Sequence, residues 1–226
     1  MQKNRLLMNE ELRMAELLCT RLCHDLTGPI GAVNNGAEFL SEDGFNMQNQ
    51  AMQLIVSSAF SAVTRLQFYR IAYGRVKEHG EANLAERQKL ALDFFTDTKI
   101  SLDWPDSHTD SAGVSISLKM SRLIYNLLII ASSVLIRGGK ITIRITMSEP
   151  TTKKVSLIIE GAGLKWDGDI DKIFKGEFSA SELTPKTIQI YLSKLYADDL
   201  NATIDYTVSE ERVELQVLQP ISPNGL

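Results

Sequence analysis

Two long segments with apolar residues at every third or fourth position constrain the fold of this chain most. The first runs from about residue 9 to 40, and the second starts near residue 54 and is ended by His79 and Gly80. The apolar positions of the first segment are Ala15, Leu18, Leu22, Leu26, Ile30, Val33, Ala37 and Leu40. This spacing predicts two amphipathic helices, joined by a turn at residues 41–46 into an antiparallel hairpin.

A hairpin of two helices cannot bury both apolar stripes by itself. The usual solution is a four-helix bundle, formed by two copies of the chain around a two-fold axis. We therefore expect a homodimer, with residues 1–80 as the dimerisation domain. The alternative is that the hairpin packs against the rest of its own chain.

Residues 81–226 show a different pattern and form the second expected domain. Helices are predicted at 82–95, 118–135 and 183–196, and strands at 99–104, 140–147, 154–160, 202–208 and 212–218. Apolar and polar residues alternate along the second strand, as in a sheet with one buried face. The expected fold class is therefore α+β, with an α/β sandwich after the hairpin.

Composition excludes several classes of protein. The net charge of -4 argues against a nucleic-acid-binding surface, which needs clustered Lys and Arg. No run of about 20 apolar residues is present to span a membrane, and the N-terminus does not resemble a signal peptide. Cys19 and Cys23 have no accompanying third ligand, so we expect free thiols and no metal site. These features predict a cytoplasmic protein.

His24 lies on the side of the first helix opposite its apolar stripe. It is two positions from both Leu22 and Leu26, so its ring should point toward water. Its own helix face carries mostly small residues, namely Thr20, Arg21, Thr27, Gly28 and Gly31. Each glycine inside a helix costs about 1 kcal/mol relative to alanine, and Pro29 removes a backbone hydrogen bond. These weaknesses predict a surface that another protein approaches closely.

The pair His24-Asp25 predicts nucleophilic chemistry at this surface. An exposed imidazole is largely neutral at pH 7, and the neutral ring is a nucleophile that can accept a phosphoryl group. Asp25 could hold one ring nitrogen and leave the other free, although neighbours on a helix lie about 100° apart and the contact needs a bent rotamer. We therefore assign His24 and Asp25 as the catalytic residues.

The sequence around His24 resembles a known family. The string His24-Asp25-Leu26-Thr27-Gly28-Pro29 on a hairpin is similar to the dimerisation and phosphotransfer domain of bacterial sensor kinases, and residues 22–40 look more specifically like the ChpT histidine phosphotransferases of alphaproteobacteria. The resemblance implies a homodimer whose second domain is a degenerate GHKL-like ATPase domain. It further implies that phosphate passes from the receiver domain of a hybrid histidine kinase, through a phosphohistidine, to response regulators.

The second domain lacks most features of a working ATP site. Asn126 resembles one Mg²⁺-binding asparagine of that fold, but Ile130 stands where a second asparagine is expected. Glu160 replaces the aspartate that would read adenine, and no glycine-rich phosphate loop follows Gly161 and Gly163. We expect Asn126 to be a buried polar residue and the two glycines to serve turns, so the chain should bind no cofactor.

The resulting prediction is a phosphotransferase that relays phosphate between receiver aspartates through His24. Mg²⁺ is expected in the partner receiver domain, and the candidate docking residues are Arg21, Thr27, Gly28, Gly31, Asn34 and Asn35. Two rivals stay open. A soluble ATP-dependent histidine kinase predicts labelling of His24 by ATP alone, whereas a non-catalytic dimeric adaptor for response regulators predicts binding without any phosphate on the chain.

Overall fold

A computed structural model describes residues 2–41, 48–76, 79–104, 115–149 and 151–221, with side chains from residue 9 onward. The chain divides into two compact units, Met1–Arg70 and Ile71–Leu226. The sequence instead placed its boundary after residue 80. Residues 42–46 of the predicted turn lie outside the described residues. Among the helices described, none is long and apolar enough to cross a membrane.

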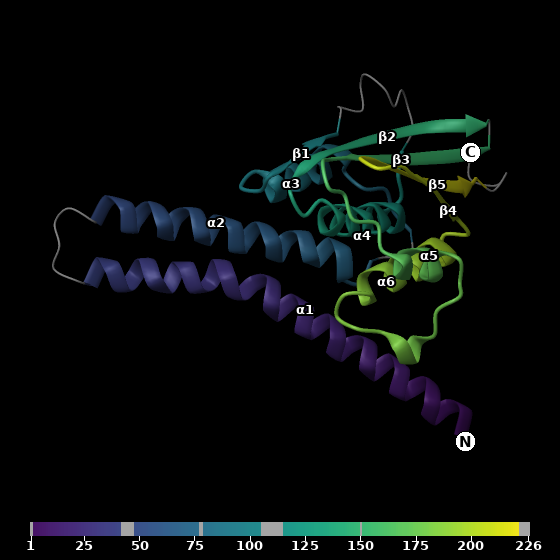
Figure 1. Cartoon of the computed structure of the whole chain (residues 1–226), viewed down its shortest axis with the longest axis horizontal. Helices are drawn as coiled ribbons and strands as arrows, with labels where there is room; N and C mark the ends of the chain where they lie inside the picture. The colour runs from purple at the N-terminus through teal and green to yellow at the C-terminus, as the bar shows by residue number, and fades with distance from the viewer. Residues whose placement is uncertain (1, 42–47, 77–78, 105–114, 150, 222–226) are drawn as a thin grey trace. The chain divides into compact units, whose positions relative to one another are not determined.

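The first unit is a hairpin of two helices, α1 (Gln2–Ser41) and the greater part of α2 (Gln48–Tyr73). Figure 1 shows their loop-proximal halves side by side and α1 bending along its length. Pro29 lies inside α1 and lacks the N–H that would bond the carbonyl of Asp25, which accounts for a bend. The prediction that α2 extends to His79 is wrong. It ends at Tyr73 because Gly74 follows, and glycine is the poorest helix former after proline.

Close packing inside the hairpin depends on small residues. Gly36 of α1 is buried, and a Cβ added there would lie 2.7 Å from Cγ1 of Ile55 and 3.2 Å from the carbonyl oxygen of Ala51. On α2, buried Ala51 and Ala62 lie at positions that face α1. The glycine therefore lets the two backbones approach, because any larger side chain would collide with α2.

The second unit contains a five-stranded sheet in the order β1-β2-β3-β5-β4. Its strands are β1 (Ile100–Asp103), β2 (Gly139–Glu149), β3 (Thr152–Glu160), β4 (Thr203–Val208) and β5 (Arg212–Pro220). β1 pairs with β2 in parallel, and the other pairs are antiparallel. Alternating residues such as Ile143, Leu157 and Leu215 are opposite one another and fully buried, so one face of the sheet is the core.

Helices cover that apolar face, and Figure 1 shows α4 and α6 beneath the sheet. The helices of this unit are α3 (Leu84–Phe95), α4 (Leu118–Val134), α5 (Gly168–Phe174) and α6 (Ile188–Asp199), with a 3-10 turn at Ala180–Glu182. Side chains of Asn83, Ser117 and Asp167 cap the first three. The α+β fold class is confirmed.

The predicted start of the last helix at Leu183 is wrong, because α6 begins at Ile188. Leu183 is extended, with φ -60° and ψ 139°. Thr184 and Thr187 then form a local turn, in which the hydroxyl of Thr187 accepts from the N–H of Thr184 at 2.9 Å. Pro185 disfavours helical geometry in the residue before it. Apolar spacing alone does not reveal such a turn, since Leu183 is buried like a helix residue.

Candidate functional site

His24 projects from α1 into solvent, as its distance from the apolar stripe predicted. The side chain is 87% exposed. The imidazole is therefore exposed on the surface of the hairpin.

The carboxylate of Asp25 contacts three side chains. Oδ1 lies 3.1 Å from Nδ1 of His24, so the predicted contact between these neighbours is present. Oδ2 accepts a hydrogen bond from the hydroxyl of Tyr69 at 2.8 Å and lies 3.8 Å from Nε of Arg21. Tyr69 comes from α2, 44 positions away in the chain. The amino-acid sequence contains no signal for this contact, because Tyr69 is spaced like the apolar residues of the second predicted helix.

This geometry determines which ring nitrogen of His24 carries the free lone pair. An ionised carboxylate only accepts hydrogen bonds, so the contact with Asp25 requires the proton to be on Nδ1. In a neutral imidazole the other nitrogen, Nε2, then carries the free lone pair. The arrangement provides an exposed nucleophile whose tautomer is set by a neighbouring carboxylate.

The predicted docking residues near His24 differ in what they offer a partner. Around Gly28 and Gly31, an added Cβ would meet no atom within 4 Å, so both positions are open. The hydroxyl of Thr27 donates to the carbonyl of Cys23 at 2.7 Å, and Arg21 is turned toward Asp25. The open surface beside His24 is thus made mainly by backbone, which allows close approach.

The asparagines lie farther along α1. Asn34 and Asn35 are exposed, and Asn34 donates a hydrogen bond to Glu38 at 2.7 Å. At about 1.5 Å rise per residue, they lie on the order of 15 Å from His24 along the helix. Both side chains are available at the surface but are not adjacent to the imidazole. The neighbouring Gly36 packs against α2.

Asn126 has no freedom to act as a metal ligand for a nucleotide. It is fully buried, and its Nδ2 donates to the carbonyls of Ala72 and Arg122, each at 2.7 Å. Its Oδ1 accepts from Nε2 of Gln189 at 2.6 Å, and Gln189 in turn accepts from the hydroxyl of Tyr73. The amide is therefore engaged at both ends in the core of the second unit, as expected for a buried polar residue.

The loop that would read adenine is also committed to other contacts. Glu160 is paired with Arg212, with 2.8 Å between Oε1 and Nη1. A Cβ at Gly161 would lie 2.6 Å from the carbonyl of Gly138, so this glycine permits close packing of two loops. Gly163 has a φ of +71° and serves a turn. The residues present do not fit a nucleotide.

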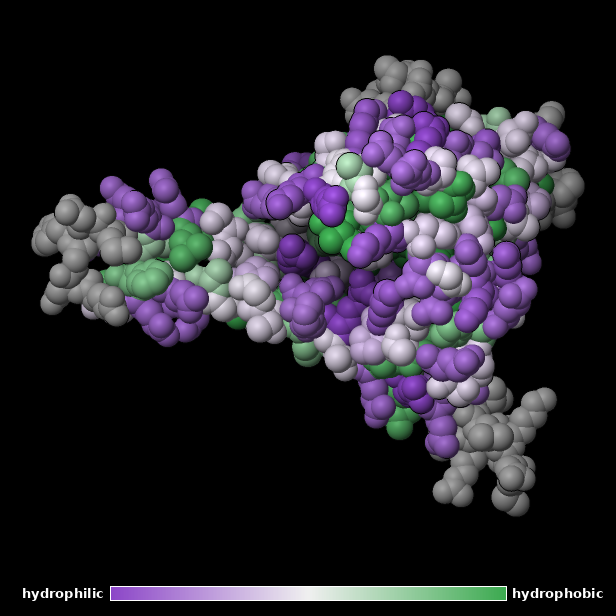
Figure 2. Space-filling view, in the orientation of Figure 1, coloured by the Kyte–Doolittle hydropathy of each residue, from purple (hydrophilic) through white to green (hydrophobic). Residues whose placement is uncertain are grey.

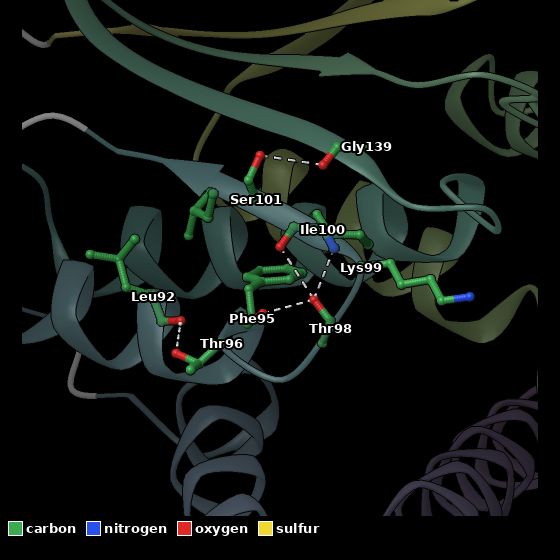
Figure 3. Close-up of a pocket in the computed structure, with 9 residues that line it drawn as sticks. Leu92, Phe95, Thr96, Thr98, Lys99, Ile100, Ser101 and Gly139 are labelled. Atoms are coloured by element: carbon green, nitrogen blue, oxygen red, sulfur yellow. Dashed lines mark hydrogen bonds between the residues drawn. The ribbon is translucent and has the colours of Figure 1, made fainter.

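A cavity of about 500 Å³ lies between α3 and the edge strand β1. Its hydroxyl groups already have backbone partners: Thr96 donates to the carbonyl of Leu92, and Thr98 lies within hydrogen-bond distance of both backbone polar atoms of Ile100. Figure 3 shows these contacts and shows Lys99 extending away from the other lining side chains. The lining residues include no carboxylate, imidazole or thiol, and no His–carboxylate pair like that of His24 and Asp25 is present in this cavity.

Cys19 and Cys23 are exposed free cysteines, as expected from their lack of partners in the sequence. Within the described ranges, no three His, Cys, Asp or Glu side chains gather as metal ligands.

Comparison with known proteins identifies the family. A family model for the histidine phosphotransferase C-terminal domain matches residues 84–212. The chain belongs to this family. Protein phosphotransferase ChpT of Brucella abortus (strain 2308) is 30% identical over 203 residues, which cover 89% of this chain and 93% of the relative.

The same relationship extends to three-dimensional structure. The 1.7 Å structure of a bacterial phosphotransferase is 28% identical, has a TM-score of 0.75 and covers 91% of this chain and 96% of that chain. The resemblance to ChpT phosphotransferases, predicted from the helix around His24, is thus confirmed. This ChpT-like chain is a phosphotransferase with a role in a phosphorelay. The family model begins after the hairpin, so the assignment of the reactive residue depends on the geometry of α1.

Proposed function

We propose that His24 is the residue that carries the phosphoryl group. The observation that supports this most directly is an 87% exposed imidazole whose Nδ1 lies 3.1 Å from the carboxylate of Asp25. The lone pair of Nε2 attacks the phosphorus of an aspartyl phosphate in a receiver domain. The bond between phosphorus and the aspartate oxygen breaks, and the receiver carboxylate is regenerated. A second receiver aspartate then reverses the same step and takes the phosphoryl group from Nε2.

Asp25 has two roles in this reaction. It fixes the proton on Nδ1 before transfer, and it stands next to the positive charge that the ring gains when Nε2 forms a bond to phosphorus. Charge stabilisation by a preorganised carboxylate requires no movement during the step. Positioning the two reactants supplies the rest, as in other phosphoryl transfers.

The proposed partners are the receiver domain of a hybrid histidine kinase as donor and response regulators as acceptors. Gly28 and Gly31 support docking beside His24, because open backbone lets the receiver loops come close to the imidazole. Asn34 and Asn35 would contact a part of the receiver more distant from the phosphate. Mg²⁺ is assigned to the acidic pocket of the receiver, and the relay is expected in the cytoplasm.

We also infer that two chains assemble through the hairpin into a four-helix bundle. Met52, Val56, Phe60 and Val63 of α2 are each 50 to 61% exposed. Their spacing of four, four and three places them on one helix face, and Figure 2 shows apolar side chains at the surface of the hairpin. Such a stripe is typical of a buried seam between helices.

The dimer is tested by size-exclusion chromatography with light scattering on two variants of α2. Val56→Glu places a charge in the stripe and should give a monomer. Gln50→Glu is a control on the same helix, since Gln50 is exposed and is not three or four positions from any residue of the stripe. A wild-type monomer, or a dimer that Val56→Glu leaves intact, would contradict this interface.

The relay itself is tested with a receiver domain loaded with labelled phosphate. Label should move to the wild-type chain, not to His24→Gln, and then to a second receiver domain. Label that also appears on His24→Gln would exclude His24 as the carrier. Transfer from ATP alone would favour the histidine-kinase rival and contradict the assignment of a nucleotide-free second domain. Receiver binding without any label on the chain would favour the adaptor.

A further inference from the structure

Tyr69 is connected to the reactive histidine through Asp25. Its hydroxyl donates to Oδ2 of Asp25 at 2.8 Å, while the other oxygen, Oδ1, faces Nδ1 of His24 at 3.1 Å. Tyr69 itself is 5% exposed. The three side chains therefore form a chain of hydrogen bonds from a buried phenol on α2 to an exposed imidazole on α1.

A carboxylate beside a histidine on the same helix does not keep this orientation without support. Neighbouring side chains project about 100° apart, so Asp25 has to rotate toward His24. Arg21, one turn earlier, is close enough to attract the same carboxylate, with 3.8 Å between Nε and Oδ2. A hydrogen bond from Tyr69 to Oδ2 anchors the far oxygen and keeps Oδ1 directed at Nδ1. The anchor comes from a second helix, so its position does not depend on the side-chain torsions of α1.

We propose that Tyr69 is a positioning residue for phosphotransfer: by holding the carboxylate of Asp25, it keeps the proton of neutral His24 on Nδ1 and the lone pair on Nε2. The role resembles that of outer partners that orient a ligating or reacting histidine through its second nitrogen. This inference rests on the proposed function of His24, and Tyr69 does not touch the phosphoryl group.

The tautomer of His24 provides a test that needs no phosphotransfer. Nitrogen-15 NMR distinguishes the two neutral tautomers, and the signals of His24 are identified by their loss in His24→Gln. In the wild type, the Nδ1-protonated form should dominate. In Tyr69→Phe, which keeps the ring and removes only the hydroxyl, the two tautomers should become mixed. Asp25→Asn should abolish the preference for Nδ1.

Tyr73→Phe is a matched control on the same helix. Its hydroxyl, one turn after Tyr69, bonds Gln189 within the second unit and has no part in the contact with Asp25. Its tautomer ratio should equal that of the wild type. Equal ratios in Tyr69→Phe and wild type, in folded protein as judged by circular dichroism, would overturn the proposal.

Kinetics give a second readout. Transfer from a phosphorylated receiver domain should be about tenfold slower in Tyr69→Phe, the size expected from losing one hydrogen bond to a charged group. In an Asp25→Asn background, Tyr69→Phe should not slow transfer any further, because the carboxylate that Tyr69 holds is already absent. Equal slowing in both backgrounds would contradict action through Asp25. If His24→Gln still accepts phosphate, the proposed function fails, whereas the tautomer result for Tyr69 stands.

Discussion

Replacing Gly31 by alanine should stabilise the chain and slow phosphotransfer at the same time. Alanine is favoured over glycine inside a helix by about 1 kcal/mol. The added methyl would meet no atom within 4 Å beyond its chain neighbours and its own helix backbone, so no clash offsets this gain. For 226 residues, about 1 kcal/mol raises the melting temperature by roughly 2 to 4 °C. A methyl group on the docking surface should displace the incoming receiver and slow transfer by roughly tenfold to a hundredfold.

Gly36→Ala is the matched control on the same helix, and its stability effect should have the opposite sign. There the methyl would lie 2.7 Å from Cγ1 of Ile55, and forcing apart the two helices should cost roughly 1 to 3 kcal/mol. Thermal melts followed by circular dichroism give the stability change, and label transfer from a phosphorylated receiver gives the rate. A Gly31→Ala variant that transfers phosphate at the wild-type rate would refute the docking role. One that melts below wild type would refute the open position of Gly31.

Three further predictions concern the second unit. Asn126→Ala should lower the free energy of unfolding by roughly 1 to 3 kcal/mol, as measured by urea titration, because it removes the buried Oδ1 that accepts from Gln189 at 2.6 Å; an unchanged midpoint would contradict the buried network. Leu215→Ala, at a fully buried position of β5, should cost roughly 2 to 5 kcal/mol in the same titration, and a cost near zero would place it outside the core. Hydrogen bonds to the carboxylate, of which the one from Trp166 has the largest effect, hold the pKa of Asp171 below its usual range. The stabilisation from these bonds is therefore present above the usual carboxyl pKa and is lost as the pH falls through the lower pKa of the folded state. Asp171→Asn should therefore weaken the acid dependence of stability, measured by melts across the acid range, and an identical pH profile would count against this contact.

The sequence by itself predicted the exposed side of the first helix at His24 and the core face of the central strand, and it predicted His24 as the reacting residue. The distance of His24 from the stripe at Leu22 and Leu26 predicted an exposed ring, and the ring is exposed. The alternation of Ile141, Ile143 and Ile145 predicted a strand with one core face, which is present. These are local properties, because the period of apolar residues along one element is enough to orient its side chains.

Only the tertiary structure decided which distant residues meet. The contact of Tyr69 with Asp25 and the collision that Gly36 avoids with Ile55 both depend on how α2 is rotated and offset against α1. The start of α6 depends on a turn at Thr184 that competes with helix formation. Apolar periodicity leaves the rotation, offset and local turn geometry open, since many arrangements bury the same stripe. The prediction of His24 therefore needed only the sequence, whereas the contact between Tyr69 and Asp25 needed the tertiary structure.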